Sequence, residues 1–296
     1  MEEAIMEEPD YGALKKGGFM RQIQKDRFSL RLRVAGGQFG AAQLRKVSEV
    51  AERFGQGYVH FTSRQGLEIP FIALENISAV KDALGEAGIS PGACGPRVRT
   101  VTACQGSAIC PGGLIETSGL AKEMDARYFG AELPHKFKIG ITGCPNNCLK
   151  AEENDLGVKG AALPVWRSGE CTFCGLCEGV CPAHAISMGK AAETIRFEAA
   201  RCAFCGKCVK SCPANAWEGK NGYLLSFGGS FGNEINPGAV ILPLMFDKQE
   251  LFTAADGAIG FFKAHGKAGE RFGKTIRRAG LAVFTDYMRG KMEIQR

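Results

Sequence analysis

Hydrophobic and basic residues alternate near the start of the chain. Leu30, Leu32 and Val34 are separated by single arginines, which predicts a half-buried strand that Gly36 and Gly37 end. The pattern then predicts a helix over 41–55 with a glycine after its last turn, an extended segment over 58–72 and a helix over 77–88. Strand, helix, strand and helix in this order predict an α+β unit of about seventy residues.

The pattern changes after about residue 93. It predicts a basic extended stretch over 97–104, a helix over 115–128 and a strand over 136–142. Cysteine-dense sequence then interrupts the chain between 168 and 218, which predicts an inserted module. Ordinary α/β character returns with the segment over 223–232, an apolar strand near Val240 and helices toward the C-terminus.

Length and composition predict a soluble globular protein of two or three domains. The chain has 296 residues, of which 45% are hydrophobic. The most apolar segment, Ala239–Phe246, is short and interrupted by Pro243, so no membrane insertion is expected. The acidic start lacks the features of a secretory signal, which favours the cytoplasm. Residues 1–22 are predicted to form a mobile or docking tail.

The net charge of +6 raises the question of nucleic-acid binding. The basic residues form neither a long run nor a patch interleaved with aromatic side chains, so we expect no nucleic-acid partner.

Eight of the 13 cysteines form a repeated motif, CxxCxxCxxxCP, over Cys171–Pro182 and Cys202–Pro213. In this motif three cysteines bind one cubane and the fourth binds the other, as in bacterial two-cluster ferredoxins, which the segment resembles. The alternative is a pair of zinc sites. The repeat predicts 4Fe-4S ligand sets Cys171, Cys174, Cys177, Cys212 and Cys202, Cys205, Cys208, Cys181.

Four other cysteines lie in two tight pairs, Cys104 with Cys110 and Cys144 with Cys148. Any one of them could be a buried structural thiol, but two close pairs favour a further 4Fe-4S cluster. Cys94 lies outside all these sets, and we interpret it as a small core residue.

This second cysteine pattern, with several other segments, resembles the sulfite and nitrite reductase family, whose siroheme is bridged to a 4Fe-4S cluster through one cluster cysteine. The resemblance covers about residues 24–165 and 220–290. Besides the four cysteines, it is carried by RLRVAGG (Arg31–Gly37), TSRQGLEI (Thr62–Ile69), KFK (Lys136–Lys138), FGGSFG (Phe227–Gly232) and GERFG (Gly269–Gly273).

The resemblance implies an α+β fold with a ferredoxin-like half domain and a siroheme and 4Fe-4S α/β domain, interrupted by a bacterial-type ferredoxin domain with two 4Fe-4S clusters. The expected boundaries are 1–22 for the tail, 23–92 for the half domain, 93–167 with 219–296 for the siroheme domain, and 168–218 for the insertion.

Three basic pairs have the even spacing that places both members on one face of a strand: Arg31 with Arg33, His60 with Arg64, and Lys136 with Lys138. They either form solvated outer faces or bind the siroheme carboxylates and an oxyanion substrate.

The resemblance implies roles for individual residues. Cys148 bridges to the siroheme iron, and Lys136 and Lys138 face the substrate. Catalytic contributions are also expected from Arg64 and Arg99. His60 stands where relatives carry arginine, and it either donates protons or packs. The expected siroheme-binding residues are Arg31, Arg33, Thr62, Gln65 and Arg97.

The leading hypothesis is an anaerobic or dissimilatory-type sulfite reductase that makes sulfide in a six-electron reaction, with siroheme and three 4Fe-4S clusters. Nitrite reduction to ammonia and a non-catalytic electron carrier are the alternatives. Because no GxGxxG motif opens a helix after a strand, an external donor protein or subunit is expected. Longer relatives carry the half domain and the siroheme domain twice, whereas this chain carries them once. This difference predicts a homodimer, a paired related subunit or a higher oligomer.

Overall fold

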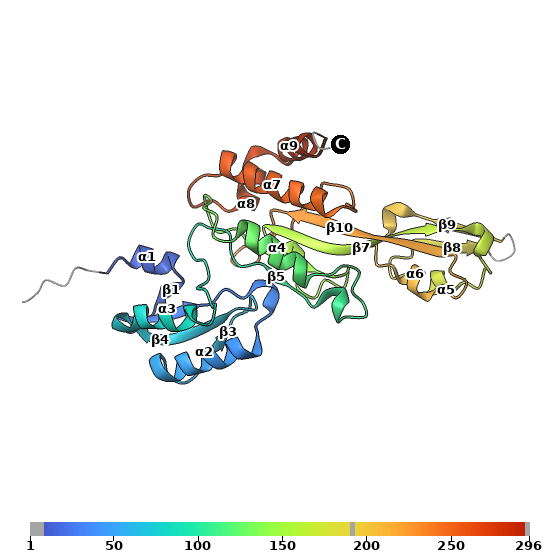
Figure 1. The fold of residues 1–296 in the computed structure, drawn as a ribbon. Helices are drawn as coiled ribbons and strands as arrows, with labels where there is room; N and C mark the ends of the chain where they lie inside the picture. The colour runs from blue at the N-terminus through green and yellow to red at the C-terminus, as the bar shows by residue number, and fades with distance from the viewer. Residues whose placement is uncertain (1–8, 190–192, 294–296) are drawn as a thin grey trace, which may run out of the picture. The chain divides into compact units, whose positions relative to one another are not determined.

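The computed structural model describes residues 9–189 and 193–293, and the chain divides into two compact units. Unit 1 comprises Met1–Thr102, Ala121–Ile139 and Lys267–Arg271. Unit 2 comprises Ala103–Leu120, Gly140–Gly266 and Phe272–Arg296. Each unit is therefore assembled from segments that are distant in the sequence (Figure 1).

Unit 1 is built on a four-stranded antiparallel sheet in the order β1–β2–β4–β3. The strands are β1 (Phe19–Arg21), β2 (Arg27–Arg31), β3 (His60–Phe61) and β4 (Leu67–Ala73). The helices are α1 (Tyr11–Lys16), α2 (Ala41–Phe54) and α3 (Ile77–Gly85), while α4 (Ser118–Tyr128) begins in unit 2 and continues into unit 1. The predicted strand–helix–strand–helix order is confirmed.

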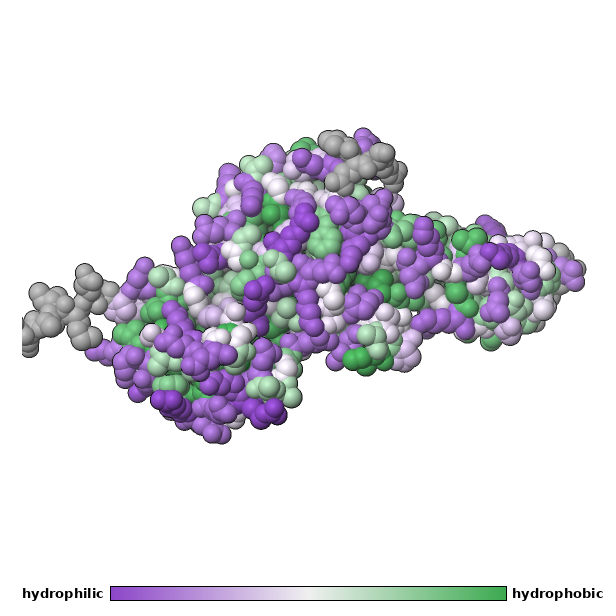
Figure 2. All heavy atoms as spheres, in the orientation of Figure 1, coloured by the Kyte–Doolittle hydropathy of each residue, from purple (hydrophilic) through white to green (hydrophobic). Residues whose placement is uncertain are grey.

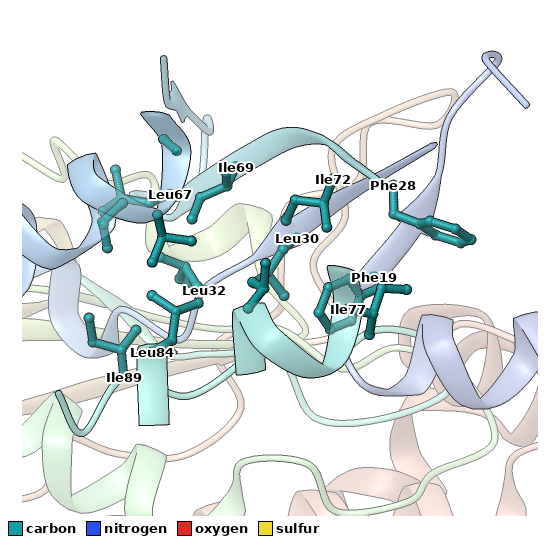
Figure 3. Close-up of a cluster of buried hydrophobic side chains, with 14 of the residues drawn as sticks. Phe19, Phe28, Leu30, Leu32, Leu67, Ile69, Ile72, Ile77, Leu84 and Ile89 are labelled. Atoms are coloured by element: carbon teal, nitrogen blue, oxygen red, sulfur yellow. The ribbon is translucent and has the colours of Figure 1, made fainter. Parts of the chain in front are cut away.

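The core of unit 1 follows from the predicted alternation. Phe28 and Leu30 of β2 are buried while Arg31 is exposed. Figure 3 shows these two apolar side chains in one cluster with others from β1, β4 and α3, among them Ile69 and Leu84. Burying each such side chain contributes about 1.5–3 kcal/mol. The outer side around α2 is mostly hydrophilic, as Figure 2 shows.

The predicted tail over residues 1–22 is wrong for the part that the structure describes from Tyr11 onward. The Asp10 carboxylate accepts a 2.9 Å hydrogen bond from the Ala13 amide and caps α1. β1 then pairs with β2, and Phe19 is 1% exposed. Residues 1–8 lie outside the described residues. The apolar anchor of Phe19 explains why this segment joins the sheet.

Unit 2 contains a sheet in the order β10–β7–β6–β5. Its strands are β5 (Thr102–Ala103), β6 (Ile139–Thr142), β7 (Leu156–Trp166) and β10 (Trp217–Phe227). β7 and β10 pair antiparallel without a break, from Leu156 opposite Phe227 to Trp166 opposite Trp217. The predicted strand near Val240 is wrong: Ala239 and Met245 make only isolated bridges, because prolines around this segment cannot donate ladder hydrogen bonds.

Three helices complete the unit: α7 (Lys248–His265), α8 (Phe272–Ala279) and α9 (Leu281–Glu293). Phe284 packs edge-to-face on the rings of Phe227, Phe261 and Phe272, with ring centroids 5.6, 4.8 and 5.6 Å away. This aromatic core ties the helices to the end of β10.

Between β7 and β10 the chain forms the cysteine-dense module. It contains the hairpin of β8 (Ile186–Gly189) and β9 (Thr194–Phe197), and two short helices, α5 (Leu176–Gly179) and α6 (Lys207–Ser211). The 3₁₀ helices of the described chain are η1 (Ala35–Gly37), η2 (Leu74–Asn76), η3 (Gly106–Ala108), η4 (Ala151–Glu153), η5 (Ser168–Glu170) and η7 (Ala199–Arg201). Among the described helices, none is both long and apolar enough to cross a bilayer.

Candidate functional site

Unit 1 holds a cavity of about 300 Å³ that gathers cationic side chains. Its walls include Thr62 and Thr100, and none of the described residues that line it is acidic. Five cations from four separate segments line it: Arg31, Arg64, Arg99, Lys136 and Lys138. Such a lining suits an anionic ligand.

Arg31 and Arg33 do not share the cavity, although their spacing predicted a common face. Arg31 lines the cavity and pairs with Glu68, and its Nη1 lies 3.9 Å from the Sγ of Cys94. Arg33 instead donates to Asp125 at 2.6 Å, and Asp125 is 1% exposed. Because β2 ends at Arg31, strand alternation does not govern Arg33.

His60 and Arg64 also diverge, because β3 ends at Phe61 and a turn follows. The Thr62 hydroxyl accepts a 3.0 Å hydrogen bond from the Gly66 amide, and Gln65 has a φ of 57°. The turn places Arg64 in the cavity wall, where its Nη2 donates to the Thr100 carbonyl at 3.1 Å.

The His60 ring is 64% exposed, with Nδ1 3.3 Å from Glu68 Oε2, and it does not line the cavity. Gln65 is likewise absent from the lining, although its side chain packs close to Gly37. The predicted common face of His60 and Arg64 is therefore wrong.

Arg99 and Arg97 separate in the same way. The Arg99 guanidinium lines the cavity and is held by the carbonyls of Ala93 and Gly95, the latter at 3.0 Å. Burial, and to a lesser degree the neighbouring cation of Arg31, lowers the pKa of Arg99 from its ordinary value. Arg97 points elsewhere, to an exposed carboxylate of Glu132 at 2.9 Å.

Lys136 and Lys138 lie just before β6, in the cavity wall. Sequence reasoning missed their neighbour His135, whose Nδ1 accepts a 2.7 Å hydrogen bond from the Lys136 amide. Burial, followed by the charges of Arg271, Lys136 and Arg99, lowers the pKa of His135. Its position directly before the KFK segment was the available signal.

In unit 2 the structure brings Cys104, Cys110, Cys144 and Cys148 together. Burial raises the pKa of the Cys144 thiol, and the other three thiols lie near enough to raise it further. A Cβ on Gly112 would lie 3.7 Å from Cys110 Sγ and 3.8 Å from Cys144 Sγ. The Gly143 amide donates to Cys104 Sγ at 3.0 Å. Cys148 is exposed.

The loop that carries Cys148 is braced on both sides. Asn147 has a φ of 53°, and its Oδ1 accepts a 2.9 Å hydrogen bond from the Ala151 amide. The Glu152 carboxylate accepts hydrogen bonds from the side-chain amide of Asn147 and from the ammonium of Lys159. A Cβ at Gly229 would lie only 1.9 Å from the Glu152 carbonyl, so the FGGSFG loop needs glycine there.

The module brings together the two predicted sets of cysteines. Cys171, Cys174, Cys177 and Cys212 line one cavity. In the other set, burial raises the pKa of Cys208 to about 12, with smaller contributions from Cys202, Cys205 and Cys181.

The two sets repeat one backbone pattern. The thiol sulfurs of Cys181 and Cys212 each accept an amide hydrogen bond from the residue four positions later, at 3.3 and 3.2 Å. Amide donors of this kind stabilise sulfur ligands of a cluster.

No three thiol, imidazole or carboxylate groups in residues 9–189 and 193–293 converge closely enough for a single metal ion. A cubane places different demands on its ligands, since each thiolate binds a separate iron atom. Each of the three sets supplies four thiols, the number that a cubane takes. Cys94 is 1% exposed, in agreement with a core position, and contacts Arg31.

Two family models match the chain. The nitrite/sulfite reductase ferredoxin-like half domain matches residues 20–87, and the nitrite and sulphite reductase 4Fe-4S domain matches residues 94–295. These matches, with the similar sulfite reductases named next, support siroheme and one 4Fe-4S cluster.

Similar proteins include the coenzyme F420-dependent sulfite reductase of Methanocaldococcus jannaschii, 30% identical over 87% of this chain and 41% of that protein. One polypeptide of the anaerobic sulfite reductase of Salmonella typhimurium is 33% identical over 52% of this chain and 50% of that polypeptide. The chain thus spans about half the length of these curated relatives.

Two solved structures share the fold. Dissimilatory sulfite reductase I aligns with a TM-score of 0.73 at 18% identity, over 88% of this chain and 69% of that one. The NirA protein of Mycobacterium tuberculosis aligns with a TM-score of 0.66 at 18% identity, over 96% of this chain and 46% of that one. The predicted α+β fold class is confirmed, and with family models matching both parts of its sequence, the chain belongs to the nitrite and sulfite reductase family.

Proposed function

We propose that this chain provides the site at which sulfite is reduced to sulfide in a six-electron reaction, at a siroheme bridged through Cys148 to a 4Fe-4S cluster. The observation that carries the proposal is the cavity of unit 1, whose five cations come from segments far apart in the sequence. Cations in a partly desolvated cavity attract an oxyanion more strongly than they do in water.

The donor set fits the implied groups. Siroheme is a polycarboxylate, and the arginines of the cavity are suited to carboxylates because a guanidinium offers paired donors. Cys148 is exposed, so its sulfur can serve both a cluster and a second metal centre. When bound, siroheme and its partner cluster supply the iron that takes the substrate atom and the electrons that reduce it.

The protein side chains have two tasks in this proposal. Arg31, Arg64 and Arg99 hold anionic oxygens, and the carbonyls that bind Arg64 and Arg99 fix those two guanidinium groups in place. Lys136 and Lys138 donate protons to oxygen atoms of the substrate, so that each oxygen leaves as water.

We also propose that residues 168–218 form an inserted ferredoxin domain with two further 4Fe-4S clusters that pass electrons inward. The convergence of each predicted cysteine set supports this part of the proposal. Together with siroheme, three cubanes predict about 13 irons per chain. An external donor protein or subunit supplies the electrons.

Anaerobic assays with reduced methyl viologen as the electron donor test the reaction. We expect about six viologen cations oxidised per sulfite consumed and one sulfide released, with a siroheme absorption spectrum. A higher kcat/KM with nitrite, with ammonia as its product, would replace sulfite by nitrite as the substrate. Purified protein without siroheme absorption would instead favour the electron carrier.

The chain is proposed to work as a homodimer or higher oligomer, because longer family members carry the half domain and the siroheme domain twice. Sedimentation of the anaerobic holoprotein checks this directly. A monomer with full activity would contradict it.

A further inference from the structure

The two cysteine sets of the module differ in what they contact. Ala162 of β7 donates its amide to the Phe204 carbonyl at 2.8 Å and forms a parallel bridge with Cys205. Gly206 follows with a φ of 66°, and a Cβ there would lie 3.1 Å from the Ala162 Cβ and 3.5 Å from Leu114 Cδ2. The glycine permits a close approach of the Cys205 loop to β7 and to Leu114.

Leu114 continues the contact toward the other four-thiol set. Leu114, Ala162 and Cys144 form one buried cluster, with exposures of 7%, 2% and 8%. The Leu114 amide donates to the carbonyl of Gly143, the residue before Cys144, at 2.8 Å. Packed side chains and two hydrogen bonds therefore join Cys205 to Cys144.

A lysine fastens the same junction from the module side. Lys210 of α6 donates from Nζ to the carbonyl of Pro111, the residue after Cys110, at 2.8 Å. A cavity of about 570 Å³ beside this bond is lined by both Cys144 and Cys205, and by Lys207.

The set of Cys171, Cys174, Cys177 and Cys212 has different surroundings. The described residues around its cavity all belong to the module, and Trp217 at the start of β10 closes it. The Trp217 ring packs edge-to-face on Phe197, with centroids 5.6 Å apart. This set has no counterpart of the Ala162 and Leu114 contact among its lining residues.

We propose that the module has a fixed direction. Cys202, Cys205, Cys208 and Cys181 form the exit set, which passes electrons to the Cys144 set through Ala162 and Leu114. Cys171, Cys174, Cys177 and Cys212 form the entrance set, which receives electrons before the exit set does. This inference rests on the proposed function of the module. Each transfer oxidises one cluster and reduces the next by one electron, and no bond forms or breaks.

Electron paramagnetic resonance of the dithionite-reduced holoprotein tests the order without measuring turnover. A reduced exit cluster broadens the signal of the coupled cluster, because magnetic interactions between unpaired electrons fall steeply with distance. We expect Cys205→Ala to remove most of this broadening and Cys174→Ala to retain most of it. Iron analysis of each variant checks that one cluster was lost and that the other two remain.

The possible failures are distinct. A wild-type protein with no iron beyond siroheme and the coupled cluster would refute the proposed function of the module. A wild-type protein with all three clusters, in which Cys174→Ala loses at least as much broadening as Cys205→Ala, would overturn only the order.

A second pair of variants leaves every thiol in place. In stopped-flow experiments on the pre-reduced holoprotein mixed with sulfite, Lys210→Gln should slow reoxidation of the module clusters about fivefold, since the bond to Pro111 is lost. Lys207→Gln removes an equal charge from the same cavity and should change the rate less than about twofold. Equal rates in the two variants would contradict the role of the junction.

Discussion

The cavity of unit 1 and the cysteine sets of unit 2 are built in opposite ways. In the cavity, the five cations come from four segments that are far apart in the sequence, and the carbonyl of Thr100 that holds Arg64 is 36 residues away from it. In the cysteine sets, most ligands lie within a few residues of one another, and local amides hold the sulfurs. Ligand sets of the second kind can be predicted from spacing, whereas the first kind depends on the whole fold.

The largest effect should come from the thiol side of this comparison. Cys148→Ser removes the proposed cluster ligand and bridge, so sulfite reduction should fall by more than about 100-fold, beyond the loss typical of outer-shell changes. Iron content and the visible spectrum check the cause. Cys94→Ser, a buried thiol outside all three sets, should keep full cluster iron. Equal iron loss in both variants would contradict the assignment.

The next effect separates two arginines of one segment. Arg99→Gln removes a cation that lines the cavity and should lower kcat/KM for sulfite about 100-fold. Arg97→Gln breaks only an exposed pair with Glu132 and should change it less than about threefold. Steady-state kinetics and melting temperatures of both holoproteins check this. Similar losses in the two variants would show that the cavity is not the anion site.

A third variant tests stability rather than chemistry. Arg33→Gln leaves the Asp125 carboxylate, whose side chain is 2% exposed, without its cationic partner. The expected cost is about 3 kcal/mol, which lowers the melting temperature by about 5–10 °C. Arg27→Gln, on the exposed side of β2, is the matched control and should melt close to the wild type. A cluster-loaded Arg33 variant that melts with the control would contradict this interpretation.

The smallest effect concerns His135. The pKa of His135 is lowered in the folded protein, so below about pH 6.5 the unfolded chain binds more protons than the folded protein does. The free energy of unfolding therefore falls as the pH falls. The His135→Gln variant cannot take up this proton. Its loss of melting temperature between pH 7 and pH 5.5 should be smaller by about 1–2 °C. Parallel curves for the two proteins would show that folding does not lower the pKa of His135.

The sequence predicted the fold where local pattern governs it. The alternation around Leu30 and the glycine after α2 correspond to a buried strand face and a helix end. β1 escaped prediction because its only strong signal is Phe19, whose partner strand lies farther along the chain.

The candidate site divides along the same line. The spacing of the cysteines predicted the sets because most members of each set are close in sequence, and the repeated motif indicated the distant fourth member of each module set. Even spacing failed for Arg33 and His60, since it indicates a common face only while a strand continues. Asp125, which binds Arg33, is 92 residues away, and no local signal could reveal it.

The unbroken ladder of β7 and β10 has a consequence for the engineering of this chain. Trp166 and Trp217 face each other as cross-strand partners, so the ends of the two strands are close enough for a two-residue turn to join them. The whole segment between them therefore leaves and re-enters the sheet at neighbouring positions, and the contacts of Ala162 and Lys210 hold it against the rest of unit 2. A segment of another length can therefore be inserted between Trp166 and Trp217 while the β7–β10 ladder is kept.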